Sequence, residues 1–313
     1  MADGIAKKKG KSLTLNLFGR AKRDGHKIVV LTAYDLTSAL IAARGGVDAL
    51  LVGDSLGMVV LGYNSTLPVT VDDMVHHCRA VARAQTQVPI IADMPYGSFH
   101  VSPEQTVEHA LRLVKEGGAH AVKIEGGRQR AEVIRALIDA EIPVMGHLGL
   151  TPQSVNRLGG YTVQGRDAAT AQRLREDAQL LVDWGCFALV LECVPSSLAS
   201  AITSAIKIPT IGIGAGAGCD GQVLVYHDML GLFGGVKPKF VKQYAALGEA
   251  AQEAIAQYVA EVRSGDFPGT EHQYAEQIPD PLHGDGTAIG ESGNGTIGSG
   301  TMGYLDDIES EKG

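Results

Sequence analysis

The sequence predicts an α/β protein built on a (β/α)8 barrel, also called a TIM barrel, and three observations support this fold class. Short apolar runs alternate with amphipathic helical patterns along most of the 313-residue chain, as in parallel sheets built from βα units. Eight such runs can be counted, which is the number of strands in this barrel. With 45% hydrophobic residues, the chain can bury the single large core that one barrel requires.

Each predicted strand is an apolar run bounded by glycine, proline or polar residues. The predicted strands are residues 28–31, 50–52, 88–93, 121–125, 142–147, 187–192, 208–213 and 222–226. Three of them open with an aliphatic residue followed by Pro89, Pro143 or Pro209. Proline can occupy the first position of a strand without removing a ladder hydrogen bond, so this recurrence marks a weak internal repeat of βα units.

The predicted helices begin and end at residues that suit those positions. Thr70 can cap a helix whose first turn holds Asp72 and Asp73, where negative charge interacts favourably with the helix dipole. Ser102 can cap another helix, with Pro103 at its first helical position. The remaining helices are predicted over residues 12–22, up to Gly45 and Gly46, over 128–140, up to Trp184 and Gly185, and over 241–263.

The two ends of the chain differ in composition from the rest. Residues 266–313 hold ten acidic residues, one lysine and ten glycines with few large apolar side chains, which predicts a mostly disordered acidic, Gly-rich tail. Residues 1–11 contain four lysines and are predicted to form a flexible basic arm. Residues 12–265 are therefore expected to form the catalytic barrel.

Charge and cysteine content limit the class of partner and the compartment. Outside the tail, 26 of the 27 basic residues stand against 25 of the 35 acidic ones, so the barrel lacks the excess of basic residues typical of nucleic-acid binders. No apolar run approaches the length of a membrane span or a signal peptide. Four scattered cysteines without CxxC spacing fit a reducing cytoplasm better than a disulfide framework.

Acidic side chains stand at the ends of three consecutive predicted strands. Asp54, Asp93 and Glu125 occupy these ends, and strand ends converge on one mouth of a barrel. Three carboxylates there would form a site for a hard cation such as Mg²⁺. A lone Asp after a strand is often only a helix cap, but three acidic ends in a row make that interpretation weaker for the set. Lys123 lies two residues before Glu125 on the same face and could hold substrate charge.

Glu192 ends an apolar strand on the other side of the predicted ring. Burial would raise the pKa of this carboxyl group and suit it to act as a general base or acid. The alternative is a carboxylate paired with a neighbouring cation. His147 also stands at a strand end, where it is either a structural histidine held by hydrogen bonds or a contact to the substrate.

A glycine-rich segment, residues 212–218, follows the seventh predicted strand. It lacks the GxGxxG register of a dinucleotide site because position 217 is alanine, and no acidic residue follows on a new strand. Dinucleotide binding is therefore not expected. The loop could instead bind phosphate or allow the chain to turn closely.

Several long motifs resemble the ketopantoate hydroxymethyltransferase family. They are residues 51–58 (LVGDSLGM), 65–70 (STLPVT), 122–127 (VKIEGG), 146–154 (GHLGLTPQS), 191–195 (LECVP), 211–216 (IGIGAG) and 238–240 (PKF). The similarity covers about residues 12–272, and motifs of this length in this order are highly specific. The tail beyond matches nothing associated with the family.

The resemblance implies a barrel of the phosphoenolpyruvate mutase and isocitrate lyase superfamily that acts in pantothenate biosynthesis. Such enzymes transfer a hydroxymethyl group from 5,10-methylenetetrahydrofolate to 3-methyl-2-oxobutanoate and form 2-dehydropantoate. The family assembles as large homo-oligomers, often decamers. The roles carried over are Mg²⁺ binding for Asp54, Asp93 and Glu125, substrate binding for Asp54, Ser55, Asp93, Lys123 and His147, and proton abstraction for Glu192.

Two other functions are compatible with the same residues. A superfamily lyase would cleave a C–C or C–P bond of an oxo acid with the same metal site and would need no folate. A catalytically idle barrel would bind a metabolite or serve as a scaffold, although the complete set of acidic strand ends argues against it. The sequence does not identify the folate contacts.

Overall fold

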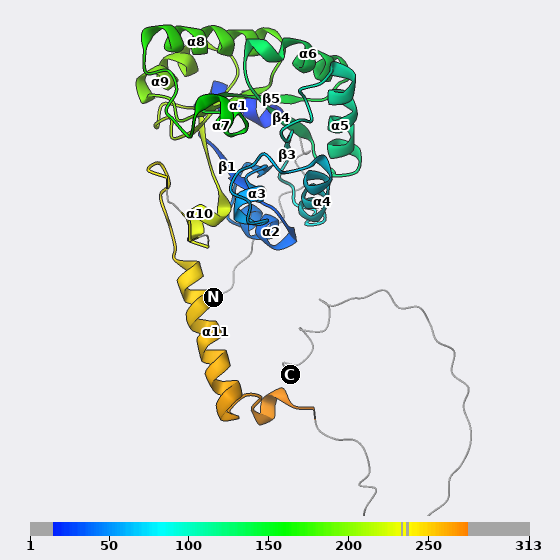
Figure 1. The fold of residues 1–313 in the computed structure, drawn as a ribbon, viewed down its shortest axis with the longest axis vertical. Coiled ribbons are helices and arrows are strands. Elements are labelled where there is room, and N and C mark those ends of the chain that lie inside the picture. Colours follow the sequence, from blue (N-terminus) through cyan, green and yellow to red (C-terminus); the bar gives the residue numbers. More distant parts are fainter. Residues whose placement is uncertain (1–14, 233, 236–237, 275–313) are drawn as a thin grey trace, which may run out of the picture. The chain divides into compact units, whose positions relative to one another are not determined.

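The computed structural model describes residues 15–232, 234–235 and 238–274 (Figure 1). Eight parallel strands form a closed barrel in chain order, and β1 pairs with both β2 and β8, so the predicted fold class is confirmed. The strands are β1 (Ile28–Thr32), β2 (Ala49–Val52), β3 (Ile90–Asp93), β4 (Ala121–Glu125), β5 (Val144–Gly149), β6 (Ala188–Glu192), β7 (Thr210–Ile213) and β8 (Gly221–Leu224). The predicted basic arm and residues 275–313 of the predicted tail lie outside the described residues.

Three strands begin one residue after a proline, two residues later than predicted. Pro89, Pro143 and Pro209 immediately precede β3, β5 and β7. Their carbonyl oxygens accept backbone hydrogen bonds of 2.9, 3.0 and 3.0 Å from the amides of Leu50, Val122 and Leu189 on the preceding strands. Each proline thus joins the ladder only as a hydrogen-bond acceptor, because proline has no backbone N–H to donate.

Helices that connect consecutive strands cover the outside of the barrel (Figure 1), and further helices precede the first strand and follow the last one. The longer ones are α1 (Asn16–Asp24), α2 (Leu36–Arg44), α4 (Val71–Ala82), α5 (Pro103–Lys115), α6 (Ala131–Asp139), α8 (Ala168–Asp183), α9 (Ser196–Ala205) and α11 (Leu247–Ser264). The short ones are α3 (Leu56–Val59), α7 (Val155–Leu158), α10 (Tyr226–Leu230), η1 (Arg128–Arg130) and η2 (Pro152–Ser154). The predicted caps are present, because the side chains of Thr70 and Ser102 accept hydrogen bonds from the amides of Asp73 and Gln105.

Three predicted helix starts are wrong. The opening helix begins at Asn16 rather than at residue 12. The last helix begins at Leu247 rather than 241, because the preceding segment runs without helical structure along α10, where Val241 is buried and the Tyr244 amide donates to the Met229 carbonyl oxygen at 2.7 Å. The helix predicted over 128–140 opens with the 3-10 turn η1 before α6.

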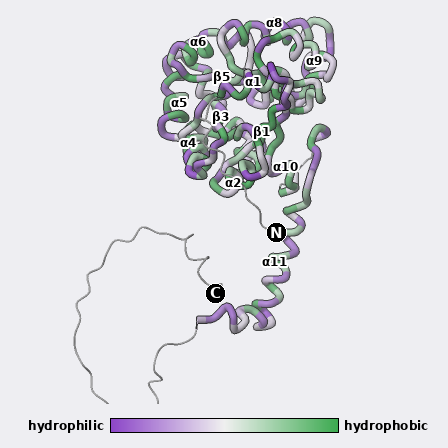
Figure 2. Tube along the Cα trace, turned by 180° about the vertical axis from the view of Figure 1, so that it is seen from behind, coloured by the Kyte–Doolittle hydropathy of each residue, from purple (hydrophilic) through white to green (hydrophobic). Residues whose placement is uncertain are grey.

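The apolar side chains of each strand alternate between two cores. On β2, Ala49 and Leu51 point into the barrel, whereas Leu50 and Val52 pack against the surrounding helices. This is the two-residue period of a strand that is buried on both faces, and the strand region around β1 is predominantly hydrophobic in Figure 2. Phe18 of α1 joins the inner core and meets Phe187 edge to face at a centroid distance of 5.2 Å.

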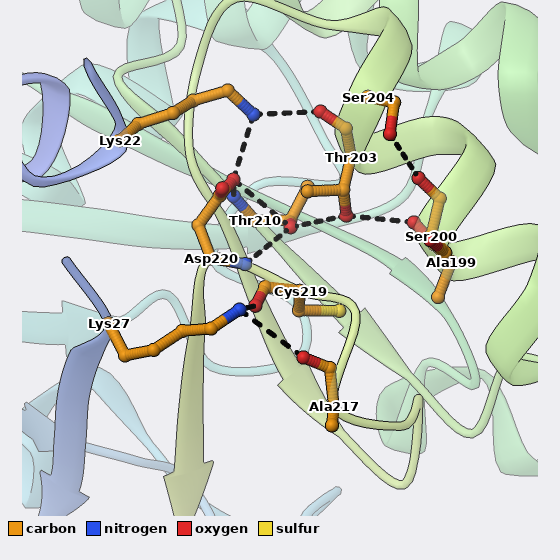
Figure 3. A network of polar contacts seen from close by, with 10 residues as sticks. All are labelled: Lys22, Lys27, Ala199, Ser200, Thr203, Ser204, Thr210, Ala217, Cys219 and Asp220. Carbon is orange, nitrogen blue, oxygen red and sulfur yellow. Dashed lines mark hydrogen bonds and ion pairs between the residues drawn. The ribbon is translucent and has the colours of Figure 1, made fainter. Parts of the chain in front are cut away.

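A polar network attaches α1 to the connection between β7 and β8 (Figure 3). The Lys22 ammonium donates to Asp220 Oδ2 and to the Thr203 carbonyl oxygen, both at 2.8 Å. The same Asp220 oxygen accepts a 2.9 Å hydrogen bond from the Thr210 amide at the start of β7. These contacts lie at the N-terminal ends of the strands, the end of a barrel that serves stability.

The chain divides into two compact units, residues 1–257 and 258–313. In the second unit the described residues comprise the last part of α11 and the 3-10 turn η3 (Thr270–His272). Among the described residues, no helix combines the length and apolar character needed to cross a membrane. All four cysteines are free thiols.

Candidate active site

The alternation of the strands turns the predicted site residues toward the barrel interior. Inner-core residues stand two positions before each of them: Ile91 before Asp93, Ala121 before Lys123, Met145 before His147 and Val190 before Glu192. Since side chains two apart on a strand share a face, these polar groups continue the inner core at the C-terminal mouth. Asp93, Lys123, Glu125 and His147 are each at most 5% exposed.

The structure brings the predicted residues into one continuous set of contacts. The Asp54 amide donates to Asp93 Oδ2 at 3.1 Å, and Asp93 Oδ1 lies 3.0 Å from the Lys123 ammonium. Lys123 also lies 3.1 Å from His147 Nδ1, and His147 Nε2 faces Glu192 Oε2 at 3.2 Å, just outside hydrogen-bond alignment. The contacts therefore run from the end of β2 to the end of β6.

These contacts determine the tautomer of His147. Lys123 carries only donors, so His147 Nδ1 must accept, and the ring hydrogen then lies on Nε2 toward Glu192. Burial, and next the charge of Lys123, lower the pKa of His147 well below its ordinary value, so the ring is neutral. Among the described residues, His147 is the only basic side chain within 4 Å of the Glu192 carboxylate, and the alternative of a Glu192–cation pair is not what the structure contains.

Two residues without a predicted role take part in the site. Gln153 of η2 donates its side-chain amide to Asp54 Oδ2 at 2.8 Å, and its backbone amide donates to Glu125 Oε2 at 3.0 Å. The Tyr34 hydroxyl lies 2.9 Å from Ser55 Oγ. Both residues are buried in the structure. In the sequence, the one signal for a role at the site is that each lies in a segment that follows a strand. Neither stands at the end of a strand.

Glycines allow the chain to approach Glu192 and Asp54 closely. Gly149, at the end of β5, has a φ of +96°, and a Cβ there would collide with the Glu192 carbonyl oxygen. That oxygen accepts a 2.8 Å hydrogen bond from the Leu150 amide, which fixes the end of β6. A Cβ on Gly53 would lie 2.8 Å from Ser55 Oγ, so a larger residue before Asp54 would displace the Ser55 hydroxyl.

Burial shifts the pKa values of the carboxyl groups upward. The pKa of Glu192 rises to about 7 because the group is buried, and Lys123 opposes the shift only in part. The pKa of Asp54 also rises to about 7, through burial and then the charge of Asp93. Burial, followed by the charge of Asp54, raises the pKa of Glu125 well above its usual range.

Lys123 stays charged in this setting. Burial alone would lower its pKa, but the carboxylates of Asp93, Glu125 and Asp54 outweigh burial and raise it. The mouth therefore holds one buried cation surrounded by carboxyl groups, two of which bind protons readily near neutral pH.

The three carboxylates predicted as metal ligands do not meet around one point. Within the described part of the chain, no group of three or more His, Cys, Asp or Glu side chains is arranged to hold a metal ion. Magnesium, however, is commonly bound through one or two carboxylates, with water and substrate oxygens completing its octahedron. The adjacent carboxylates of Asp54 and Asp93 fit that requirement, because the Asp54 amide donates to Asp93 Oδ2 and both side chains are buried.

The glycine-rich loop after β7 packs closely against α9. A Cβ on Gly216 would lie 2.6 Å from Ser196 Cβ, and a Cβ on Gly218 would lie 2.9 Å from Ser200 Cβ. The two glycines thus serve close packing of loop and helix. Gly214 and Gly216 also adopt φ values of +65° and +82°, which allow the close turn considered for this segment.

Known proteins similar to this chain match it over the whole barrel. The model of the ketopantoate hydroxymethyltransferase family matches residues 12–270. A protein from Moorella thermoacetica named 3-methyl-2-oxobutanoate hydroxymethyltransferase is 56% identical over 262 residues, which cover 84% of this chain and 97% of the relative. A protein of the same name from Clostridium novyi is 52% identical over 272 residues, covering 86% of this chain and 99% of the relative.

Solved structures share the fold at low sequence identity. The 2,3-dimethylmalate lyase, a member of the phosphoenolpyruvate mutase and isocitrate lyase superfamily, superposes with a TM-score of 0.53 at 17% identity, covering 83% of this chain and 88% of that chain. Phosphonopyruvate hydrolase in complex with oxalate and Mg²⁺ gives a TM-score of 0.54 at 13% identity, covering 84% and 93%. These structures show the fold alone, whereas the family model and the relatives at 56% and 52% identity show that the chain belongs to the ketopantoate hydroxymethyltransferase family.

Proposed function

We propose that this protein transfers a hydroxymethyl group from 5,10-methylenetetrahydrofolate to 3-methyl-2-oxobutanoate and so forms 2-dehydropantoate in pantothenate biosynthesis. The family match and the relatives' names support this activity. The structural observation that carries it is the position of Glu192, whose side chain is only 15% exposed, at the far end of a contact series from Asp54 and Asp93. Burial raises the pKa of this carboxyl group to about 7. A group that binds a proton near neutral pH suits the abstraction of a proton from carbon next to a carbonyl.

Asp54, Asp93 and Glu125 would hold Mg²⁺, with the first two as direct ligands and Glu125 through water. This division is supported by the hydrogen bond from the Asp54 amide to Asp93 Oδ2, whereas Glu125 is joined to Asp54 through Gln153. A bound Mg²⁺ supplies Lewis acidity at the 2-oxo group of the substrate. Lys123, as the buried cation beside Asp93, binds the negative charge of the oxo acid, and Ser55 donates a hydrogen bond from the neighbouring strand end.

Glu192 removes the C3 proton of 3-methyl-2-oxobutanoate. The electron pair of the C–H bond becomes the C2–C3 double bond of an enolate, and the proton resides on the Glu192 carboxylate. A positioned base of this kind contributes roughly 10²- to 10⁴-fold to the rate. His147 carries its Nε2 hydrogen on the side of Glu192, 3.2 Å from Oε2, and contacts the substrate beside that carboxylate.

The enolate carbon then bonds to the one-carbon unit of the folate. That unit carries two C–N bonds in methylenetetrahydrofolate, both of which must break, whereas the product carries a hydroxyl group. One water molecule therefore supplies the hydroxyl group, and its second hydrogen goes to one nitrogen of the folate. The C3 proton held by Glu192 goes to the other nitrogen, which completes the released tetrahydrofolate and returns Glu192 to its carboxylate form. No covalent intermediate with the protein is required.

A product assay tests this proposal. The purified protein with both substrates and Mg²⁺ should form 2-dehydropantoate, and omission of either the folate or Mg²⁺ should abolish it. Breakdown of the oxo acid without folate would instead indicate a lyase. Absence of both turnover and deuterium exchange at C3 would indicate a barrel without catalytic activity.

We further propose that the protein acts in the cytoplasm as a homo-oligomer, with a decamer as the specific expectation. Four free thiols are consistent with a reducing compartment. Light scattering of the purified protein measures the oligomer mass directly, and cell fractionation measures the location.

A further inference from the structure

Gln153 contacts three successive strand ends although it belongs to none of them. It lies in η2, which follows β5, and it is 5% exposed. Its side-chain nitrogen Nε2 donates to Asp54 Oδ2 at 2.8 Å and to the Met94 carbonyl oxygen at 2.9 Å. Its backbone amide donates to Glu125 Oε2 at 3.0 Å. One residue thereby links the segments after β2 and β3 to the end of β4.

The chemistry of its partners fixes the orientation of the Gln153 amide. Asp54 Oδ2 and the Met94 carbonyl oxygen are both acceptors, so the NH₂ group must face them and both of its hydrogens are used. The reversed amide would direct Oε1 at two acceptors and lose both bonds. Oε1 consequently points elsewhere, and it is buried without a hydrogen-bond partner among the described residues.

A buried acceptor without a donor is unfavourable unless a ligand completes it. Leaving such a group unsatisfied costs roughly 1–3 kcal/mol. Asp93 Oδ1 and His147 Nε2 also lack an aligned hydrogen bond, but the first lies 3.0 Å from the Lys123 ammonium and the second 3.2 Å from Glu192 Oε2. Among the described residues, no hydrogen bond or ion pair reaches Gln153 Oε1, so a bound molecule is the partner that it requires.

We propose that Gln153 is a positioning residue for the cation site. Gln153 holds the Asp54 and Glu125 carboxylates in a fixed orientation, and its Oε1 accepts a hydrogen bond from a donor on a bound ligand. The inference rests on the proposed Mg²⁺ site. By taking Oδ2 of Asp54, Gln153 determines which oxygen of that carboxylate remains for the cation. Its backbone amide does the same for Glu125, whose Oε2 is taken.

Gln153→Met tests the side-chain part of the proposal. Methionine has nearly the same length but cannot donate, while the backbone bond to Glu125 is retained. Loss of a residue that orients a ligand typically weakens metal affinity roughly 10- to 100-fold. We expect a loss in this range for Mg²⁺ measured by isothermal titration calorimetry on the full chain without substrates.

Gln164→Met is the matched control. Gln164 lies in the same β5–α8 connection, and its side chain bonds only within the loop, to Thr162. Its Mg²⁺ affinity should equal that of the unmodified protein. Gln153→Asn, which keeps the amide but shortens its reach, should also weaken Mg²⁺ binding and serves if the methionine variant does not fold.

Steady-state kinetics separate positioning from a structural defect. At saturating Mg²⁺ the Gln153→Met enzyme should regain most of kcat, whereas the Mg²⁺ concentration for half-maximal activity should rise by the same 10- to 100-fold factor. A folded Gln153→Met protein that binds Mg²⁺ as tightly as the unmodified protein overturns the inference. If the unmodified protein neither binds Mg²⁺ nor forms product, the proposed function itself fails.

Discussion

Asp93 and Lys123 occupy paired positions on the neighbouring strands β3 and β4, and their charged atoms lie 3.0 Å apart with side chains 4% and 6% exposed. A pair this deeply buried stabilises the fold only while both partners are present, because either charge alone would remain uncompensated in a medium of low dielectric. The pair therefore links the stability of the barrel to the substrate-binding role proposed for Lys123.

Lys123→Met should destabilise the protein strongly. Removing one partner of a buried ion pair costs about 3–5 kcal/mol, and here the remaining carboxyl groups would also repel one another. Urea unfolding at pH 8 measures the loss. At pH 5 the loss should be smaller, because the orphaned carboxyl groups can take up protons. Lys115→Met, on the surface helix α5, is the control and should change the stability by less than about 0.5 kcal/mol.

Glu192→Gln should separate binding from proton transfer. The amide retains the size of the side chain but cannot accept the C3 proton, so deuterium exchange at C3 of 3-methyl-2-oxobutanoate should fall by roughly 10²- to 10⁴-fold. Affinity for the oxo acid, measured by calorimetry with Mg²⁺ present, should remain close to that of the unmodified protein. Undiminished exchange in the variant would falsify the role of Glu192 as the base.

The pKa of Glu192 predicts the pH dependence of the exchange reaction. Because burial places this pKa at about 7, the carboxylate form becomes scarce below that pH and predominates above it. The C3 exchange rate should therefore rise about tenfold per pH unit below pH 7 and level off above it. The residual rate of Glu192→Gln should lack this inflection.

The same pKa predicts an effect on stability. Between pH 4.5, the usual pKa of the group, and about 7, only the folded state keeps the Glu192 proton, so the contribution of this residue to stability falls as the pH rises and is constant above 7. The total change is about 3 kcal/mol. Glu192→Gln lacks this change. In urea titrations with EDTA, the free energy of unfolding of the variant should therefore rise relative to that of the unmodified protein between pH 5 and pH 8. Equal pH profiles would contradict the raised pKa.

Mg²⁺ should stabilise the unmodified protein against heat. A ligand that binds only the folded state at 100 times its Kd adds about 2.7 kcal/mol, which a thermal unfolding curve detects. Asp54→Ala and Asp93→Ala should abolish this increase in Tm, while Asp72→Ala on the exposed first turn of α4 should retain it. A full Mg²⁺ response in both site variants would exclude these carboxylates as ligands.

Asp220→Ala should lower stability without affecting catalysis. Asp220 accepts hydrogen bonds from Lys22 and from the Thr210 amide, and hydrogen bonds to a charged group contribute about 1.5–3 kcal/mol each. Calorimetric unfolding should show a Tm several degrees lower. kcat and KM should remain unchanged, because the network is at the opposite end of the strands from Glu192; an altered kcat would refute this separation.

The sequence predicted the barrel and its catalytic end because both follow from short-range patterns. Apolar runs that end in Asp93, Glu125 and Glu192 specify parallel strands and place those side chains at one mouth, and the two-residue period turns them inward. The seven predicted site residues are gathered there, although their roles stay predictions; they are Asp54, Ser55, Asp93, Lys123, Glu125, His147 and Glu192. The starts of β3, β5 and β7 differed by two residues because the preceding prolines contribute only their carbonyl groups.

The sequence could not predict contacts that loop side chains make with distant segments. Gln153 and Tyr34 follow strands in loops or short turns, where no periodicity indicates the direction of a side chain. Their partners Asp54 and Ser55 lie 99 and 21 positions away in the chain. The non-helical course of residues 241–246 likewise depends on a contact with α10 that local propensity does not encode.

The prolines before β3, β5 and β7 also protect the mouth against slippage of the strands. A shift of β3 by one residue would turn Asp93 out of the barrel and place an apolar neighbour in its position. The missing N–H of Pro89 makes such a shift unfavourable, because a neighbouring carbonyl would then face a residue that cannot donate. Pro143 does the same for His147 on β5. Prolines at the N-terminal ends of the strands thereby help to determine which side chains line the C-terminal mouth of the barrel.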